Sequence, residues 1–161
     1  MKKLKLETTL DVFDSVSELP QDIQELMNKA QQAREKAYAP YSSFKVGAAL
    51  QLANGEVVLG NNQENAAFPS GLCAERVAIF YAGATYPGVA VTSIALTVRS
   101  LEHTVTTPTP PCGACRQSIA EYEVNQKSPI NIYFMGETGT VVKADSIEVL
   151  LPFVFDNTFL K

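Results

Sequence analysis

Three cysteines and one glutamate are the residues whose types and spacing could support metal chemistry. Cys73 and Glu75 lie two positions apart, and Cys112 and Cys115 form a C-x-x-C motif; the chain has no other cysteine. A structural zinc site normally has four protein ligands, whereas a catalytic site keeps three and leaves one position for water. Because the single histidine, His103, lies outside both motifs, we expect a site of three cysteines and a water.

The charged neighbours of the cysteines could tune such a site. Glu75 would lie beside the metal without binding it, where a carboxylate can take a proton from water and return it to a substrate. Three thiolates exceed the charge of Zn²⁺, and Arg76 and Arg116 each follow a cysteine closely enough to donate to it. The predicted helix starts at Cys73 and Cys112 also stabilise thiolates. The alternatives are an ordinary first-turn glutamate and solvated surface arginines.

Length and composition restrict the class of protein. The 161 residues suit one domain, and the net charge of -4 argues against a nucleic-acid polymer or an anionic membrane as partner. We find no membrane-spanning run and no signal-peptide core, so we expect a cytoplasmic protein. An odd number of cysteines suits a reducing compartment and a metal. The alternative is a redox C-x-x-C with one spare core cysteine.

The apolar pattern predicts strands that alternate with helices. A helix is expected from Ser17 until Pro40, a hairpin around Asn54-Gly55, and a short final helix that Asp145 caps. The remaining expected elements are helices over 73–84 and 112–124 and strands over 44–52, 57–59, 89–98, 129–135 and 140–143. This pattern is typical of an α/β fold with three layers, α/β/α, around a mixed, about five-stranded sheet.

The N-terminal segment falls outside this pattern. Residues 3–13 alternate loosely between apolar and polar side chains, so they could form an added edge strand or a loose arm. We therefore divide the chain into an N-terminal arm of unknown role, residues 1–16, and a single domain, residues 17–161.

Four motifs together resemble a known family. They are Cys73-Ala74-Glu75-Arg76, the run from Pro111 to Gln117 (PCGACRQ), the run from Asn62 to Ala66 (NQENA), and the run from Ala39 to Leu50 (APYSSFKVGAAL). The first two match the Cys-x-Glu and Pro-Cys-x-x-Cys arrangement of zinc deaminases. With the other two, the chain resembles the small, homotetrameric cytidine deaminases of the cytidine/deoxycytidylate deaminase superfamily. The resemblance extends from about residue 21 to residue 160.

The resemblance implies a cofactor and a set of roles. Cys73, Cys112 and Cys115 would bind one Zn²⁺ per subunit, and Glu75 would be the catalytic proton shuttle. Asn62 and Glu64 would hold the ribose 3′ hydroxyl, Phe44 would lie against the pyrimidine ring, and the Pro110 carbonyl would accept a hydrogen bond from the departing amino group. The substrate-binding set further includes Ala66, Phe68 and Phe155.

Two features depart from the family pattern or extend it. Phe68 stands where many relatives have a tyrosine, which removes a hydroxyl, and the arm extends the chain beyond the compact family core. In relatives of this length, active sites are completed across subunits in a homotetramer. Phe68 and Phe155 match positions that reach a neighbouring site, although Phe155 could instead fill a core.

The expected activity is hydrolytic deamination of cytidine and 2′-deoxycytidine to uridine and 2′-deoxyuridine, in pyrimidine salvage. Zinc-bound hydroxide would attack C4 while Glu75 moves the protons. Alternatives are a deaminase for another aminated heterocycle, such as blasticidin S, and a non-catalytic domain that zinc merely staples together. A polynucleotide deaminase would need a basic, aromatic surface that this sequence lacks.

Overall fold

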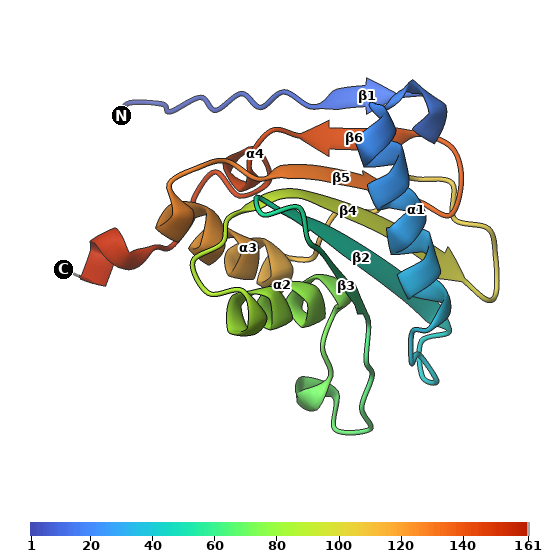
Figure 1. Cartoon of the computed structure of the whole chain (residues 1–161). Coiled ribbons are helices and arrows are strands. Elements are labelled where there is room, and N and C mark those ends of the chain that lie inside the picture. The colour runs from blue at the N-terminus through green and yellow to red at the C-terminus, as the bar shows by residue number, and fades with distance from the viewer. Residues whose placement is uncertain (161) are drawn as a thin grey trace.

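The predicted strands assemble into one six-stranded sheet in the computed structural model, which describes residues 1–160 (Figure 1). Its order is β1-β6-β5-β4-β2-β3; β4 and β5 are parallel and every other neighbouring pair is antiparallel. The expected mixed sheet is therefore confirmed. The strands are β1 (Asp11–Phe13), β2 (Phe44–Leu52), β3 (Val57–Asn61), β4 (Val91–Ser100), β5 (Asn131–Met135) and β6 (Val141–Ala144).

Helices cover both faces of the sheet, which confirms the three-layer α/β/α architecture. Helix α1 (Gln21–Glu35) packs on one face, and α2 (Ala74–Thr85), α3 (Gly113–Gln126) and the short α4 (Ile147–Leu150) pack on the other (Figure 1). Short 3-10 turns lie at Val16–Glu18, Phe68–Ser70 and Asn157–Leu160.

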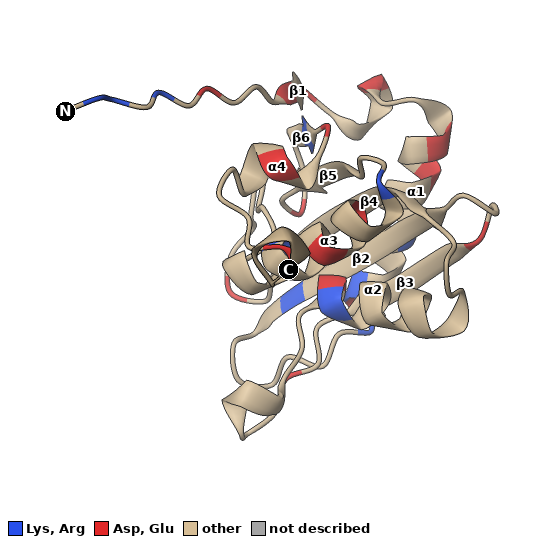
Figure 2. Cartoon of the chain, turned by 90° about the vertical axis from the view of Figure 1, so that its left-hand side faces the viewer, with Lys and Arg blue, Asp and Glu red and all other residues tan. Residues whose placement is uncertain are grey.

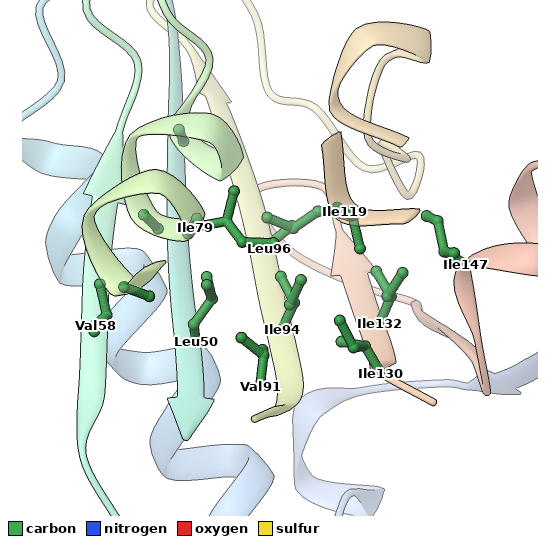
Figure 3. Close-up of a cluster of buried hydrophobic side chains, with 14 of the residues drawn as sticks. Leu50, Val58, Ile79, Val91, Ile94, Leu96, Ile119, Ile130, Ile132 and Ile147 are labelled. Carbon is green, nitrogen blue, oxygen red and sulfur yellow. The ribbon is translucent and has the colours of Figure 1, made fainter. Parts of the chain in front are cut away.

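Two apolar clusters hold these layers together. Because successive strand residues point to opposite faces, Leu50, Ile94 and Ile132 face α2 and α3, where they meet buried residues such as Ile79 and Ile119 (Figure 3). The intervening residues of β2, β4 and β5 face α1 and pack against its buried stripe, which consists of Ile23, Leu26, Met27 and Ala30. The central strands are thus buried on both sides, as their nearly continuous apolar runs predict.

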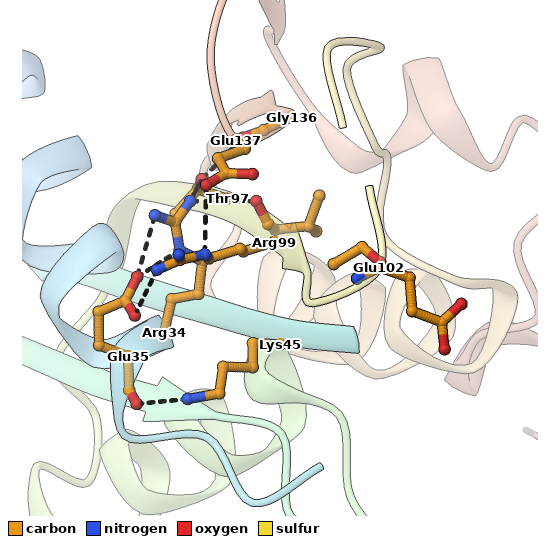
Figure 4. A network of polar contacts seen from close by, with 10 residues as sticks. Arg34, Glu35, Lys45, Thr97, Arg99, Glu102, Gly136 and Glu137 are labelled. Carbon is orange, nitrogen blue, oxygen red and sulfur yellow. Dashed lines mark hydrogen bonds and ion pairs between the residues drawn. The ribbon is translucent and has the colours of Figure 1, made fainter. Parts of the chain in front are cut away.

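A polar network interrupts the α1 face near the end of β4 (Figure 4). Arg34, 7% exposed, donates to the Thr97 hydroxyl at 2.9 Å and to the Val98 carbonyl at 3.0 Å. It also pairs with Glu35, which Arg99 reaches from β4. Burying a guanidinium is costly unless its donors are satisfied, and here both neighbouring elements supply acceptors.

The sheet has one strand more than expected, because part of the arm joins it. Asp11, Val12 and Phe13 pair with Lys143, Val142 and Val141 of β6, so the edge-strand alternative for this segment is confirmed over these three residues. The strand occupies an edge of β6 that would otherwise present unpaired backbone groups.

Several expected element bounds are shifted, and two of these shifts, at the first and last helices, have a clear cause. The first helix begins at Gln21 and not at Ser17, because Pro20 has extended backbone angles and its carbonyl accepts the first helical hydrogen bonds, from Ile23 and Gln24. It ends at Glu35, before the turn that leads to Pro40. Ser146, and not Asp145, caps the last helix: its side chain accepts from the Glu148 N–H. The capping side chain belongs to the residue just before the helix, and a sequence pattern locates that residue only to within a position or two.

The topology brings two helix starts to one edge of the sheet. Strands β3 and β4 are both antiparallel to β2, so they run in the same direction and end at the same edge. Each is followed along the chain by a helix, α2 after β3 and α3 after β4. In α/β sheets this edge, at the carboxyl ends of such strands, is where ligands bind. Among the described residues, no helix is long and apolar enough to span a membrane.

Candidate metal centre and active site

The three cysteines converge where α2 and α3 begin. Cys73 and Cys112 are the residues just before the two helices, and Cys115 lies in the first turn of α3. Their sulfur atoms all lie within 4.8 Å of one another, with 3.9 Å between those of Cys73 and Cys112. Gly60 of β3 makes this placement possible, because a Cβ there would overlap the Ala74 carbonyl oxygen at the start of α2.

This donor set fits a zinc ion. Zinc–sulfur bonds of about 2.3 Å in a tetrahedron place two sulfurs about 3.8 Å apart, which agrees with the 3.9 Å between Cys73 and Cys112. Cys115 is fully buried, while Cys73 is half-buried and Cys112 exposed, so the cluster opens on one side. Three thiols with one open side match a zinc site that keeps a position for water.

Arg76 is the cation nearest to the thiols. Its Nη2 donates to the Cys73 sulfur at 3.7 Å from one helical turn further along α2. Hydrogen bonds from the Cys115 thiol and from Arg76 lower the pKa of Cys73 to about 5, although burial opposes this shift. The Arg76 Nε is buried and has no hydrogen-bond partner within the described part of the chain. The first turn of α2 thus stabilises the Cys73 thiolate, and the Arg76 Nε–H is left available to donate a further hydrogen bond.

Glu75 is buried beside the same thiols. The residue is 5% exposed, and burial is the largest cause that raises the pKa of its carboxyl; the neighbouring Cys73 charge adds to this effect. A carboxyl whose pKa is moved toward neutrality can both accept and donate a proton near neutral pH. An ordinary first-turn glutamate would lie in solvent, so its burial favours the chemical role over the alternative.

A cavity of about 740 Å³ opens onto the cysteines and Glu75. Its lining includes Cys73, Cys112, Glu75 and Arg76, together with further residues of the β3–α2 loop such as Asn62 and Glu64. A volume of this size falls within the range of small-molecule sites. The predicted substrate residues that line it are Phe44, Asn62, Glu64, Phe68 and Pro110.

Asn62 and Glu64 bind the backbone that frames the cavity. The Asn62 amide accepts from the Val46 N–H at 2.8 Å and donates to the Phe44 carbonyl at 2.9 Å. Glu64 accepts from the N–H groups of Tyr41 and Ser42 and from the Ser42 hydroxyl. An amide has two acceptor and two donor positions and a carboxylate about four acceptor positions, so both side chains keep capacity for a ligand.

Arg116 occupies a different position from the one expected. Its Nε donates to the Pro111 carbonyl at 2.8 Å and its Nη1 to the Leu150 carbonyl at 2.9 Å. The guanidinium therefore joins the segment before Cys112 to the end of α4. Of the two arginines considered for charge compensation, Arg76 is the one that contacts a thiol in the described structure.

Two predicted substrate residues lie outside the lining of this cavity, Ala66 and Phe155. Ala66 is exposed in the β3–α2 loop. Phe155 is exposed, stacks on Phe159, and is held by its carbonyl, which accepts from Gln117 at 2.7 Å. Phe68 is 74% exposed and meets the Tyr41 ring edge-on, with 5.9 Å between centroids.

The structure adds residues to which the sequence assigned no role. Leu96 and Val98 of β4 form an apolar part of the lining, and Tyr41, Ser42 and Thr109 line it from loops. Leu96 and Val98 belong to a buried apolar run, in which nothing distinguishes a cavity wall from core. Ser42 could have been noticed as a turn residue within the recognised motif of residues 39–50.

Comparison with known proteins agrees with this site. Residues 20–128 match the family model described as cytidine and deoxycytidylate deaminase zinc-binding region. The chain is 48% identical to a cytidine deaminase of Halalkalibacterium halodurans over 102 residues, which are 62% of this chain and 71% of that protein. It is 39% identical to a cytidine deaminase of Sporosarcina psychrophila over 134 residues, 83% of this chain and 91% of the relative.

Solved structures give the same result. The crystal structure of cytidine deaminase from Burkholderia pseudomallei matches with a TM-score of 0.71 and 41% identity, over 81% of this chain and 97% of that one. The crystal structure of cytidine deaminase from Mycobacterium tuberculosis matches with a TM-score of 0.64 and 30% identity, over 83% of this chain and 97% of that one. The three-cysteine cluster fits one Zn²⁺ per subunit. The chain therefore belongs to the family of zinc-dependent cytidine and deoxycytidylate deaminases.

Proposed function

We propose that this protein deaminates free cytidine and 2′-deoxycytidine by hydrolysis, giving uridine or 2′-deoxyuridine and ammonia. The observation that carries the proposal is the buried Glu75 beside three clustered thiols in the wall of one cavity. A zinc ion that only stapled the fold would need no buried carboxyl in that place.

Cys73, Cys112 and Cys115 would hold the metal, and the positions of their sulfurs fit it. When bound, zinc lowers the pKa of water, so that a nucleophile is available near neutral pH. Arg76 withdraws negative charge from Cys73 through its 3.7 Å contact. Cys115, fully buried in the first turn of α3, gives the cluster a rigid side.

Glu75 moves both protons of the reaction. It takes one proton from the attacking water and gives it to N3 of the pyrimidine as the new C–O bond forms at C4. It then takes the remaining hydroxyl proton and delivers it to the amino group, which leaves as ammonia while the C4 carbonyl forms. The raised pKa of Glu75 suits a group that must both accept and donate. The Pro110 carbonyl accepts a hydrogen bond from the departing amino group.

The part of the cavity lined by Phe44, Asn62 and Glu64 would bind the nucleoside. Phe44 lies against the pyrimidine ring, and Asn62 and Glu64 hold the 3′ hydroxyl with the hydrogen-bonding capacity that the backbone leaves free. Arg76 is the one cationic side chain among the described residues of the lining, and it is turned to Cys73. A phosphate would find no free arginine or lysine there, which favours nucleosides over nucleotides.

Several wider roles belong to the same proposal. The protein would act in pyrimidine salvage in the cytoplasm and would form a homotetramer whose active sites are shared between subunits. Ala66, Phe68 and Phe155 are exposed, as residues that complete a neighbouring subunit's site would be in an isolated chain. Arg116 supports the site indirectly, through the Pro111 carbonyl.

The test is direct. Zinc-loaded protein is incubated with cytidine, 2′-deoxycytidine and 2′-deoxycytidine 5′-phosphate, and the loss of cytosine absorbance and the release of ammonia are measured. We expect one ammonia per nucleoside consumed, and a much lower kcat/KM for the phosphate. Stoichiometric zinc without turnover of any of the three would instead support the structural-zinc alternative.

A further inference from the structure

The first ten residues of the arm leave the body of the protein as an extended segment (Figure 1). Strand β1 pairs with β6 along one edge, with Asp11 opposite Lys143. Continuing this register would place Leu10 opposite Ala144, where β6 ends, and the chain then turns into α4. Residues 2–9 thus extend beyond the end of β6 and have no strand beside them. The other edge of β1, away from β6, has no neighbouring strand within the described chain.

This segment has the side-chain pattern of a strand with one apolar face. Residues of even number share one face of an extended chain, and those here are apolar apart from Lys2, Thr8 and Asp14. The exposed members are Leu4, Leu6, Leu10 and Val12. Val12, already within β1, is 64% exposed. An open strand edge that carries an apolar face is a template for pairing with another chain.

The charge of the segment indicates what it would pair with. Residues 1–10 contain three lysines and one glutamate, a formal charge of +2. Because the net charge of the whole chain is -4, the remaining residues carry -6. Acidic residues lie where the arm joins the body, Asp11 on β1 and Asp22 in the first turn of α1, while residues 1–10 lead away from the body (Figure 2). Residues 4–12 themselves contain one lysine, Lys5, and two acidic residues, Glu7 and Asp11, so an antiparallel copy of the same segment can place unlike charges opposite one another.

We propose that residues 4–12 pair antiparallel with the same residues of a second copy of this chain, around a two-fold axis at Thr8. Two six-stranded sheets would become continuous through β1 of each copy, an isologous contact in which both partners use the same surface. Leu4 then lies opposite Val12 of the second copy, and Leu6 opposite its Leu10.

The charges agree with this register. On the opposite face Lys5 lies across from Asp11 of the second copy, which accepts Lys143 at 3.5 Å in its own chain. Opposite charges across strands stabilise a pair and like charges destabilise it. Moving the register by two residues places Glu7 opposite Glu7 or Asp11. Moving it by one places leucines opposite charged residues, because a one-residue slip exchanges the faces.

Disulfide formation at the axis tests the register. In Thr8→Cys the two cysteines would face one another with Cα atoms about 4.5–5.5 Å apart, within the range of a disulfide. In the matched control Thr9→Cys they would be about 8 Å apart, since Thr9 faces Glu7. We expect mild oxidation to give a species of twice 17.5 kDa for most of Thr8→Cys, and for little of Thr9→Cys or the wild type. Equal yields from the two variants, or none from Thr8→Cys, would overturn the proposal.

A pair of charge reversals tests the partner contacts. Lys5→Glu and Lys3→Glu change the net charge equally, but Lys5 faces Asp11 and Lys3 faces Phe13. Added to Thr8→Cys, Lys5→Glu should lower the disulfide yield about fivefold or more, because two attractions become repulsions, while Lys3→Glu should lower it less. Both variants lie outside the core, and unchanged far-UV spectra and zinc content verify their folding. Equal losses would mean that general charge, and not this register, governs the contact.

Discussion

Two arginines lie on opposite faces of the sheet near the end of β4, and they differ in how many of their hydrogen-bond donors have an acceptor. On the α1 face, Arg34 has acceptors from Thr97, Val98 and Glu35, and Thr97 in turn donates to the Gly136 carbonyl at 2.8 Å (Figure 4). On the other face, Arg76 donates one long hydrogen bond to the Cys73 sulfur, and its buried Nε has no partner among the described residues.

The difference separates a structural polar cluster from a reactive one. Buried polar groups are almost always paired, and an unpaired one needs an explanation. The Arg34 network is complete and connects α1, β4 and the β5–β6 turn, so its contribution is to stability. The Arg76 side of the sheet holds an unpaired donor, a thiolate and a buried carboxyl, Glu75, which is an arrangement that a substrate or metal would complete.

The largest expected effect separates the two clusters by activity. Glu75→Gln keeps the size of the side chain but removes the carboxylate that moves protons, so kcat should fall by about 10²–10⁴-fold or more. Zinc content, measured by metal analysis, should stay at one per chain because the three cysteines are intact. The control is Glu121→Gln, an exposed glutamate of α3 that accepts from Asn125. Retention of a tenth of wild-type turnover in Glu75→Gln would show that another group carries the protons.

Removing the complete network should instead affect stability. Arg34→Leu leaves the Val98 carbonyl and the Thr97 hydroxyl without a buried donor, which costs about 1–3 kcal/mol of unfolding free energy. The Tm of a chain of this length should fall by about 2–4 °C per kcal/mol, with kcat/KM of the folded fraction little changed. Arg99→Gln, at a half-exposed ion pair, should cost less than about 1 kcal/mol. Equal melting temperatures for the two variants would remove the distinction between the clusters.

The hydrogen-bonding capacity that Asn62 and Glu64 keep for a ligand can be tested by changing the substrate and leaving the protein intact. If Asn62 and Glu64 hold the 3′ hydroxyl, 3′-deoxycytidine leaves them unsatisfied, at a cost of about 1–3 kcal/mol, or roughly 10- to 100-fold in kcat/KM. The control is 2′-deoxycytidine. Altering the substrate is better than altering Asn62, whose amide also holds the backbone of Phe44 and Val46. Equal kcat/KM for the two deoxynucleosides would exclude the clamp.

The smallest expected effect concerns the pH profile. The positive charge of Arg76 lowers the pKa of Cys73 and opposes the rise in the pKa of Glu75. Without it, Glu75 is deprotonated only at higher pH, so the acidic limb of kcat/KM should move to higher pH in Arg76→Gln. Arg116→Gln is the matched control; its donors go to carbonyls, so it should lose stability without this shift. Equal pH profiles in both variants would mean that the backbone N–H groups at the starts of α2 and α3, and not Arg76, compensate the negative charge of the thiolates.

Local patterns in the sequence determined the elements and the chemistry. The hairpin at Asn54-Gly55 is a short-range signal, since Gly55 has a φ of 90° that glycine adopts without strain. The buried runs of β4 and β5 and the cysteines at two helix starts can likewise be read from neighbouring residues. These features depend on a few consecutive side chains, so one sequence was enough to predict them.

The tertiary structure decided which of these residues meet. That Cys73 and Cys112 come within 3.9 Å follows from β3 and β4 both pairing antiparallel with β2, which is a matter of strand order and not of local pattern. The same long-range packing buried Glu75, turned Arg116 to the carbonyls of Pro111 and Leu150, and made Leu96 a cavity wall. Each of these outcomes depends on contacts between segments distant in sequence, whose partners no local run of residues specifies.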